Sequence, residues 1–254
     1  MRIFTVSDIH IDYEENREWL KALSKSDYKN DILIFAGDIS HKVSLIEEAF
    51  KILSSCFSSV FYVPGNHDLW IKRGHETSKE RFHFLSNLAD NYGIKKDYSE
   101  YEKFVIAPIL CWYDYTLGKM TPKLTSQWGD FFRCDWNGMS DAQVNDYFLQ
   151  QNVIPQTQKT VISFSHFLPR IDLLPALSKL TGFLAPVLGT KKLETIIRSW
   201  PSRIHIYGHS HVNTYKWRNN TLYINNAFGY PREAHIAAKK LLDITYDVFH
   251  KDKN

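Results

Sequence analysis

Short apolar runs rich in β-branched residues recur along the chain, and each ends in polar residues or glycine. Runs of this length and composition are typical of strands buried in a sheet. Between the first three of them lie helical patterns at Glu14–Leu23 and Val43–Leu53. This βαβαβ alternation predicts a parallel sheet in the N-terminal third, with right-handed crossovers. The predicted strands are Ile3–Val6, Ile32–Phe35, Val60–Val63, Phe104–Leu110, Val161–Phe164 and Ile204–Tyr207.

The last third of the chain has a different pattern. Thr214–Trp217 and Thr221–Asn225 flank an Asn219-Asn220 pair, and asparagine is favoured in tight hairpin turns, so we predict a β-hairpin. Leu241–Phe249 alternates between apolar and polar positions and is predicted as a further strand. Antiparallel elements beside parallel ones predict a mixed sheet.

The middle of the chain is less regular. Residues 112–152 are rich in Gly, Asp, Trp and Phe, and we predict long loops there with one helix at Asp141–Gln151. A helical pair is predicted over Ile171–Ser199. No repeat, linker or low-complexity tract divides the sequence, so residues 1–254 are predicted to form a single domain.

Composition and charge narrow the function classes. A net charge of +3 in 254 residues, with no block of Lys or Arg, argues against non-specific nucleic-acid binding. The cysteines, at positions 56, 111 and 134, are odd in number and widely spaced, which favours reduced thiols in a cytoplasmic protein. The most apolar stretch, 173–188, is broken by proline, lysine and glycine, and the N-terminus lacks a leader pattern. We therefore expect neither a membrane span nor secretion.

Residues that can bind metals follow five of the predicted strands. In open α/β sheets, ligands bind in the crevice beyond the carboxyl ends of the strands, so these side chains are expected to converge. Residues i and i+2 of an extended segment point to the same side, which would let Asp8 and His10 aim at one ion. His209 and His211 would do the same. The segments are Asp8-Ile9-His10, Gly37-Asp38, Gly65-Asn66-His67-Asp68, His166 and Gly208-His209-Ser210-His211.

The donor atoms of these segments indicate which metals they would hold. Mixed oxygen and nitrogen ligands suit Mn, Fe or Zn better than Ca or Mg. Each motif alone has a simpler interpretation as a turn or a hydrogen-bonded surface residue, but five in this order are hard to attribute to chance. The candidates are Asp8, Asp38 and Asn66 for oxygen, and His10, His166, His209 and His211 for nitrogen. The remaining histidines, at 41, 75, 83, 205, 235 and 250, are interpreted as structural or solvated. His75 follows the G-N-H-D segment by a few residues, close enough in sequence to line the cleft.

The ordered set D-x-H, G-D, G-N-H-D, S-H and G-H-S-H resembles the signature of the calcineurin-like metallophosphoesterase superfamily. The resemblance runs from Asp8 to His211, and every motif is intact. It implies an α/β fold built as a four-layer αββα sandwich with two mixed β-sheets. It also implies two divalent metal ions as cofactors.

The resemblance further implies a role for each motif residue. Asp8, His10 and His211 would hold one metal, and Asn66, His166 and His209 the other. Asp38 would bridge the two. His67 would be the general acid or transition-state stabiliser beside the scissile phosphate, with Asp68 as the carboxylate that orients its ring.

Two adjacent cations imply a reaction class. They would lower the pKa of a bridging water, so that a hydroxide attacks phosphorus in line, and they would offset the charge of the transition state. We therefore expect a hydrolase that acts on a small phosphodiester or phosphomonoester, such as a nucleotide. A nuclease acting on short single strands and a non-catalytic scaffold on the same fold remain alternatives.

Aromatic residues near the middle of the chain are candidates for substrate contacts. Loops around 112–140 and 170–200 are expected to shape the substrate site, with Arg133 or Arg170 pairing a phosphate. The simpler alternative is that the aromatic side chains pack these loops onto the sheet. The candidate stacking residues are Trp112, Tyr113, Trp128, Phe131, Phe132 and Trp136.

Overall fold

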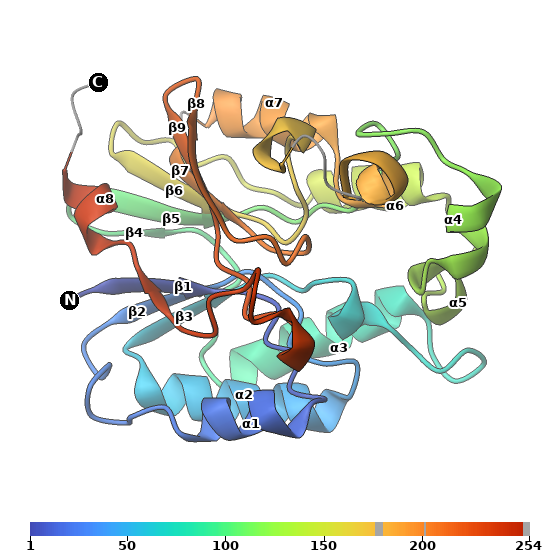
Figure 1. Ribbon diagram of the computed structural model, residues 1–254. Coiled ribbons are helices and arrows are strands. Elements are labelled where there is room, and N and C mark those ends of the chain that lie inside the picture. Colours follow the sequence, from blue (N-terminus) through green and yellow to red (C-terminus); the bar gives the residue numbers. More distant parts are fainter. Residues whose placement is uncertain (176–179, 201, 251–254) are drawn as a thin grey trace.

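Two β-sheets face each other, and helices cover the outer face of each, giving four layers in the order αββα (Figure 1). The computed structural model describes residues 1–175, 180–200 and 202–250. The α/β fold predicted from the motif resemblance is thereby confirmed. Both sheets combine parallel and antiparallel strand pairs, as predicted.

The first sheet has four strands in the order β10-β1-β2-β3. Strands β1 (Ile3–Val6), β2 (Ile32–Phe35) and β3 (Ser59–Tyr62) pair in parallel and confirm the predicted βαβαβ unit. The short strand β10 (Leu242–Asp243) pairs antiparallel with β1 and covers its outer edge.

Three helices cover the outer face of this sheet (Figure 1): α1 (Glu14–Lys21), α2 (Val43–Cys56) and α3 (Ser78–Asn91). The buried residues of α2 recur at the helical spacing that predicted it. Helix α3 was not predicted, although the sequence carries its start signal. The Thr77 hydroxyl accepts the backbone N–H of Glu80, and the Glu80 carboxylate accepts the backbone N–H of Thr77 in a capping box.

The second sheet has six strands in the order β4-β5-β6-β7-β9-β8. Its central strands are parallel, and the edge strands β4 and β8 are antiparallel to their neighbours. The predicted hairpin is confirmed, and its turn residues Asn219 and Asn220 adopt φ of 47° and 65°. The strands are β4 (Ser99–Glu100), β5 (Phe104–Pro108), β6 (Thr160–Phe164), β7 (Ser202–Tyr207), β8 (Thr214–Arg218) and β9 (Thr221–Asn225).

The helices that follow residue 112 correct two predictions. Residues 112–152 contain α4 (Pro122–Gln127) and α5 (Asp130–Arg133) besides the predicted α6 (Asp141–Leu149). The predicted helical pair over 171–199 gives one α-helix, α7 (Lys191–Ser199), with residues 176–179 outside the described part. The short 3-10 and π helices are His67–Leu69, Ile171–Leu173, Leu180–Leu184, Ala185–Val187 and Pro231–Glu233.

The C-terminal strand prediction is largely wrong. After the two residues of β10 the chain turns into helix α8 (Thr245–Phe249). The buried apolar residues Ile244 and Val248 lie four positions apart, which matches one face of a helix, while Tyr246 and Phe249 are exposed. The alternating pattern of this segment also contained a helical spacing, and packing against the sheets selected the helix.

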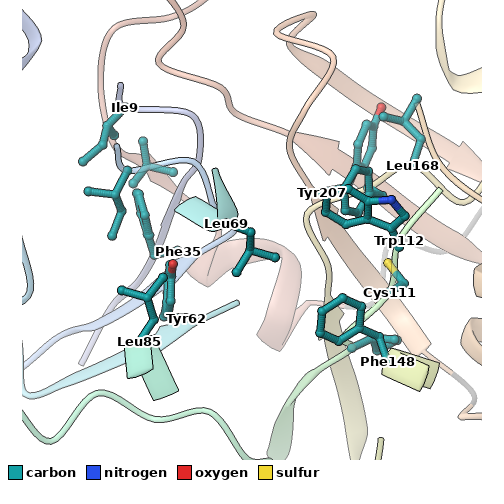
Figure 2. Close-up of a cluster of buried hydrophobic side chains, with 14 of the residues drawn as sticks. Ile9, Phe35, Tyr62, Leu69, Leu85, Cys111, Trp112, Phe148, Leu168 and Tyr207 are labelled. Carbon is teal, nitrogen blue, oxygen red and sulfur yellow. The ribbon is translucent and has the colours of Figure 1, made fainter. Parts of the chain in front are cut away.

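Alternating strand residues build two separate hydrophobic layers. Ile32 and Ile34 of β2 pack between the sheets with Ile162 and Phe164 of β6. Leu33 and Phe35, which alternate with them along β2, belong to the cluster that packs under the helices. Figure 2 shows side chains of that outer cluster. The sheets are therefore held face to face, with the carboxyl ends of β1, β2, β3, β6 and β7 leading into one region. No helix in the described part of the chain has the length and apolar character needed to cross a membrane.

Candidate metal centre

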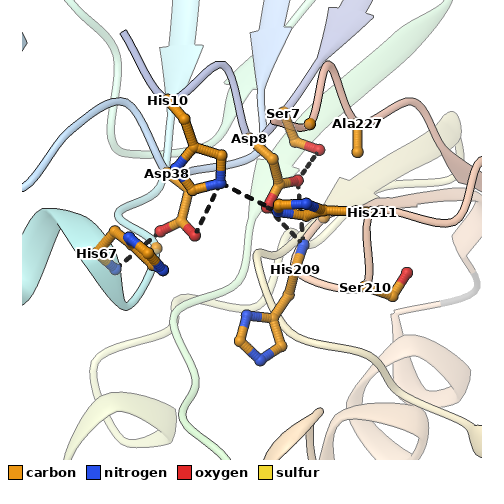
Figure 3. Close-up of polar contacts among 12 residues, drawn as sticks. Ser7, Asp8, His10, Asp38, His67, His209, Ser210, His211 and Ala227 are labelled. Atoms are coloured by element: carbon orange, nitrogen blue, oxygen red, sulfur yellow. Dashed lines mark hydrogen bonds and ion pairs between the residues drawn. The ribbon is translucent and has the colours of Figure 1, made fainter. Parts of the chain in front are cut away.

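The predicted ligand residues converge where the two sheets meet (Figure 3). The loops after β1, β2 and β3 bring four of them, and the loops after β6 and β7 bring the other three. Within the described residues, three groups of Asp and His side chains are spaced so that each could hold a metal ion. The groups are Asp8, His10 and His211; His10, Asp38 and His67; and Asp38, His166 and His209.

The first group lies around the Nε2 atom of His211. That atom is 3.0 Å from Nε2 of His10 and 3.3 Å from Oδ1 of Asp8. Two ligands about 2.1 Å from an ion and at right angles to each other are ~3.0 Å apart. The observed spacings are those expected of side chains around a common cation.

The second group lies around the Nε2 atom of His166. That atom is 3.1 Å from Oδ1 of Asn66 and 3.2 Å from Nδ1 of His209. The Oδ2 atom of Asp38 is 3.5 Å from Nε2 of His166 and 3.9 Å from Nε2 of His10. The carboxylate of Asp38 therefore lies between the two groups.

Hydrogen bonds from the opposite ring nitrogens select the tautomers of three histidines. The Nδ1–H of His166 donates to the backbone oxygen of Ala36 at 2.8 Å, which leaves Nε2 free. The Nε2–H of His209 donates to the backbone oxygen of Val187 at 3.0 Å, which leaves Nδ1 free. Nδ1 of His211 lies 2.6 Å from the carboxylate of Glu233. Partners of this kind orient metal-binding histidines.

The backbone of these segments corrects one step of the sequence argument. Asp8 and His10 have φ of 53° and 40°, and His209 and His211 have φ of 66° and 54°. These values lie in the left-handed region, so neither pair aims its side chains by being extended. Asp38 shares this conformation with φ of 61°. Such backbone is costly for residues other than glycine and concentrates at functional sites.

Glycine allows the ligand-bearing loops to approach one another closely. A Cβ atom on Gly65 would lie 2.1 Å from Oδ1 of Asp38. A Cβ atom on Gly208 would lie 2.7 Å from Oδ2 of Asp8. Both separations are shorter than atoms tolerate, so larger residues at these positions would displace the carboxylates.

The electrostatics of the cluster suit cations. Burial raises the pKa of Asp38 well above its usual value, and the nearby carboxylates of Asp8 and Asp68 raise it further. Burial lowers the pKa of His10 well below its usual value, and neighbouring histidines lower it further. Burial also lowers the pKa of His211, but Asp8 and Glu233 outweigh it and raise the pKa to about 9. A divalent cation among these groups would favour ionised carboxylates and neutral imidazoles, so the donor set fits one.

His67 faces the same cleft and is held by ring contacts. Its imidazole stacks on Trp70, with centroids 3.7 Å apart and an angle of 26° between the planes. The ring of His10 meets it edge-on, with centroids 4.8 Å apart. Burial, followed by the nearby His211 and His166, lowers the pKa of His67 to about 3. The ring is therefore neutral at pH 7 and can offer an N–H to an oxygen atom in the cleft.

The structure gives Asp68 a different role from the one expected. Its carboxylate accepts four backbone N–H groups, from Asp38, Ile39, Ser40 and Gly65, at 2.8 to 3.1 Å. It also accepts the hydroxyl of Tyr62 at 2.8 Å. Asp68 therefore ties the loop after β2 to the loop after β3, and the expectation that it orients the His67 ring is corrected.

The cleft beside the cluster has a volume of about 430 Å³. Its walls are largely aromatic and apolar, with Asp38, His67, His209 and His211 at the base. Tyr230 stands against the first group, with its ring 4.5 Å from that of His10. The wall residues are Trp70, Trp128, Asp130, Leu184, Tyr230, Glu233 and Ile236.

The residues predicted to contact the substrate differ in where they lie relative to the cleft. Trp112 is fully buried in the outer core (Figure 2), and its indole N–H donates to Asp141 at 2.8 Å, so the prediction that it contacts substrate is corrected. Arg170 pairs with Asp172 and Glu194 and lies outside the described lining of the cleft. Arg133 is exposed and also lies outside the described lining, although its guanidinium carbon is 4.8 Å from the ring centroid of Trp70, which lines the cleft.

The other aromatic candidates divide in the same way. Trp128 lines the cleft, whereas Tyr113 and Trp136 are buried and pack around Trp112. Phe131 packs against the core, and Phe132 is exposed. The interpretation that most of these residues pack the loop onto the sheet is therefore confirmed.

Two histidines outside the motifs behave as interpreted. His205 is buried between the hydroxyls of Ser163 and Ser165, at 2.8 and 3.2 Å, within the second sheet. His75 is exposed and lies outside the described lining of the cleft.

Sequence reasoning missed Asp130, Tyr230 and Glu233. Asp130 accepts a hydrogen bond from Nδ2 of Asn66 at 2.9 Å. These residues lie far in sequence from the groups they contact, and they carry no motif. Only the folded arrangement reveals them.

A sequence model described as calcineurin-like phosphoesterase matches residues 1–213, which include all of the ligand segments. The chain belongs to this family. The family is that of the phosphoesterases, enzymes that hydrolyse phosphate esters.

Relatives of this phosphoesterase include a protein named [acyl-carrier-protein] phosphodiesterase PptH from Mycobacterium tuberculosis. The two are 27% identical over 124 residues, which are 45% of this chain and 38% of that relative. The matched part of the relative is therefore less than half of its length.

Solved structures confirm the fold of the phosphoesterase. The crystal structure of phosphopantetheinyl hydrolase (PptH) from M. tuberculosis superposes with a TM-score of 0.78 and 21% identity, covering 99% of this chain and 98% of that one. A protein of Thermus thermophilus, TT1561, gives a TM-score of 0.53 and 14% identity, covering 95% and 97%.

Proposed function

We propose that this phosphoesterase hydrolyses a phosphodiester with two divalent ions, of Mn, Fe or Zn, at the cluster around Asp38. The observation that carries the proposal is that the two groups of donor atoms share this carboxylate, whose Oδ2 lies 3.9 Å from His10 and 3.5 Å from His166. One ion would take Asp8, His10, Asp38 and His211. The other would take Asp38, Asn66, His166 and His209.

Different side chains would bind the metals, donate a proton and exclude water during the reaction. Ions held by these residues would activate a water molecule near neutral pH and offset charge on the phosphoryl oxygens. The neutral imidazole of His67, at the base of the cleft, donates an N–H to a phosphoryl or leaving-group oxygen. Trp128, Leu184 and Ile236 keep water from one side of the bound ester.

The relatives favour a diester over a monoester. One is named a phosphodiesterase of acyl-carrier protein, and the solved one a phosphopantetheinyl hydrolase. By similarity, the substrate would be a phosphodiester with an organic arm on each side of the phosphate, including an arm carried on a protein. The aromatic and apolar walls of the cleft suit such an arm better than a bare phosphate.

The alternatives have less support. A non-catalytic scaffold on this fold would not need a complete set of metal ligands. This chain has the complete set, and hydrogen bonds orient three of its histidines. A nuclease would be favoured by a strongly basic surface, whereas the net charge is +3.

We also propose a cellular location and a domain organisation for the enzyme. The buried free thiols of Cys56, Cys111 and Cys134 support a cytoplasmic location. The core shared by the two sheets, and the pairing of β10 with β1, support a single domain over residues 1–254.

The proposal is tested by measuring the metal content and the ester preference of the same protein preparation. Purified protein is loaded with Mn, its metal content is measured by mass spectrometry, and hydrolysis of para-nitrophenyl phosphate and its bis ester is followed. We expect about two metals per chain and preference for the bis ester. Asp38→Ala should lose metal and more than about 100-fold of the activity. Asp97→Ala, at an exposed position outside the cleft, is the matched control. Wild-type protein that binds no metal and cleaves neither ester would refute the proposal.

A further inference from the structure

Asp130 places a buried carboxylate beside Asn66, in the wall of the cleft. It is the first residue of α5, and only 2% of its surface is exposed. Three uncharged donors surround it: Nδ2 of Asn66 at 2.9 Å, the indole N–H of Trp70 at 2.6 Å and that of Trp128 at 2.9 Å. Burying a carboxylate among neutral partners costs free energy, so its place here calls for a reason.

The hydrogen bond to Asn66 determines which end of the amide faces the cluster. An amide oxygen can bind a cation, whereas the NH₂ group has no lone pair available for one. Because Nδ2 donates to Asp130, Oδ1 points to the other side, 3.1 Å from Nε2 of His166. A flipped amide would set its oxygen against the carboxylate and its NH₂ group toward the cation, and both contacts would be repulsive.

The indole contacts extend the influence of Asp130 to the rest of the site. Trp70, which donates to it, is the ring on which His67 stacks at 3.7 Å. Trp128 donates to its other oxygen and meets the ring of His209 edge-on at 5.8 Å. Gly129 lets this segment approach, since a Cβ atom there would lie 3.1 Å from Trp70. One carboxylate therefore reaches neighbours of both His67 and His209.

We propose that Asp130 is a positioning residue that turns the oxygen of Asn66 toward the second metal and holds Trp70 against His67. The inference rests on the proposed function, because it assigns Asn66 to that metal. It makes a specific claim about the two sites. The site of Asn66, His166 and His209 depends on Asp130, and the site of Asp8, His10 and His211 does not.

Metal titration of Asp130→Asn tests this claim. The variant keeps the shape of the side chain but replaces one acceptor oxygen by a donor, so Asn66 loses its partner or turns. We expect the affinity for one Mn to fall about 10- to 100-fold while the other is unchanged, as for loss of a partner behind a metal ligand. At limiting Mn the content should drop from two ions per chain to one.

Asp114→Asn is the matched control. Asp114 is also buried, and it accepts hydrogen bonds from Asn145 and Thr190 at 3.2 and 2.8 Å, but it lies outside the described lining of the cleft. This variant should bind both ions as the wild type does. An Asp130→Asn protein that also binds both ions normally would overturn the proposal.

The double variant Asn66→Asp/Asp130→Asn separates positioning from general packing. It exchanges carboxylate and amide, so an amide behind the site can donate to a carboxylate ligand. We expect the second ion to return, which a packing defect would not allow. If Asp130→Asn does not fold, the double variant is the deciding test. Binding of two ions per chain supports the proposal, and binding of one ion overturns it. Wild-type protein that binds two ions but cleaves no ester would refute the proposed function. The role of Asp130 would still be decided by the metal titration of its variants.

Discussion

The imidazole of His67 is held by Trp70 and His10, and its low pKa keeps it uncharged. Its position at the base of the cleft suits a hydrogen-bond donor to the ester. The same geometry raises a competing assignment, because a donor atom of His67 also lies within 4.8 Å of those of His10 and Asp38. A substitution distinguishes the two roles.

Replacing His67 with Ala should leave both metals bound and lower turnover. We expect kcat for the bis ester to fall about 10²- to 10⁴-fold, the range for loss of a positioned proton donor. Steady-state kinetics and metal analysis of the same preparation measure both quantities. His75→Ala, at an exposed histidine, should behave as wild type. Loss of an ion from the His67 variant would instead make His67 a ligand.

At this scale the sequence predicted which residues gather but not how they are held. The ligand residues follow strands in motifs that are read directly from the chain. Their partners are remote: Glu233 lies 22 positions from His211, and Asp130 lies 64 from Asn66. Tautomer and amide orientation depend on these partners, so the sequence could not predict them.

At the scale of elements, the loops after β2 and β3 are joined through Asp68. Its carboxylate accepts backbone N–H groups from both loops and the Tyr62 hydroxyl. Burial raises the pKa of Asp68 to about 6, although the N–H groups of Gly65, Ser40 and Ile39 and the hydroxyl of Tyr62 act to lower it. The same loops meet where the backbone N–H of His67 donates to Oδ1 of Asp38 at 2.9 Å, so loop geometry would affect the proposed metal binding.

Asp68→Ala should therefore destabilise the protein strongly. It leaves four buried N–H groups without their acceptor, and we expect the free energy of unfolding to fall by about 3 to 5 kcal/mol. Tyr62→Phe removes one donor only and should cost about 1 kcal/mol. Urea denaturation of the metal-free proteins measures both changes. Equal losses in the two variants would contradict the role assigned to Asp68.

Strand ends were predictable because apolar runs mark buried strands and polar residues end them. Strands β1 and β2 have the predicted bounds. Helix α8 was mistaken for a strand because its short sequence fits both periods, and only packing decides between them. Helix α3 has a capping box and was overlooked beside the motif that precedes it. Left-handed backbone at Asp8 and His10 reflects constraints from both sheets, which no local pattern carries.

At the scale of the whole molecule, each proposed ion would join the two sheets. One takes Asp8 and His10 from the first sheet and His211 from the second. The other takes Asn66 from the first sheet and His166 and His209 from the second. Binding energy at the centre therefore contributes to the association of the sheets.

Removing the metals should lower the melting temperature. At a metal concentration 100 times the Kd, each ion adds about 2.7 kcal/mol, and at ~2 to 4 °C per kcal/mol this predicts a decrease of about 5 to 10 °C for one ion. Calorimetry with and without a chelator measures it. Asp38→Ala should show little further change on chelation. Equal melting temperatures for wild-type protein with and without metal would contradict the link between the sheets.

The separation of the ligands in sequence has a consequence for biosynthesis. His10 and His211 lie 201 positions apart. At ~5 to 20 residues per second, a ribosome needs about 10 to 40 s to span that distance. Between translation of Asn66 and translation of His166, the nascent chain carries Asp8, His10, Asp38 and Asn66 without the histidines that follow β6 and β7. On the proposed ligand assignment, tight binding of either ion would need residues from both halves of the chain. A molecule that has bound metal would then be one in which translation has reached His209 and His211.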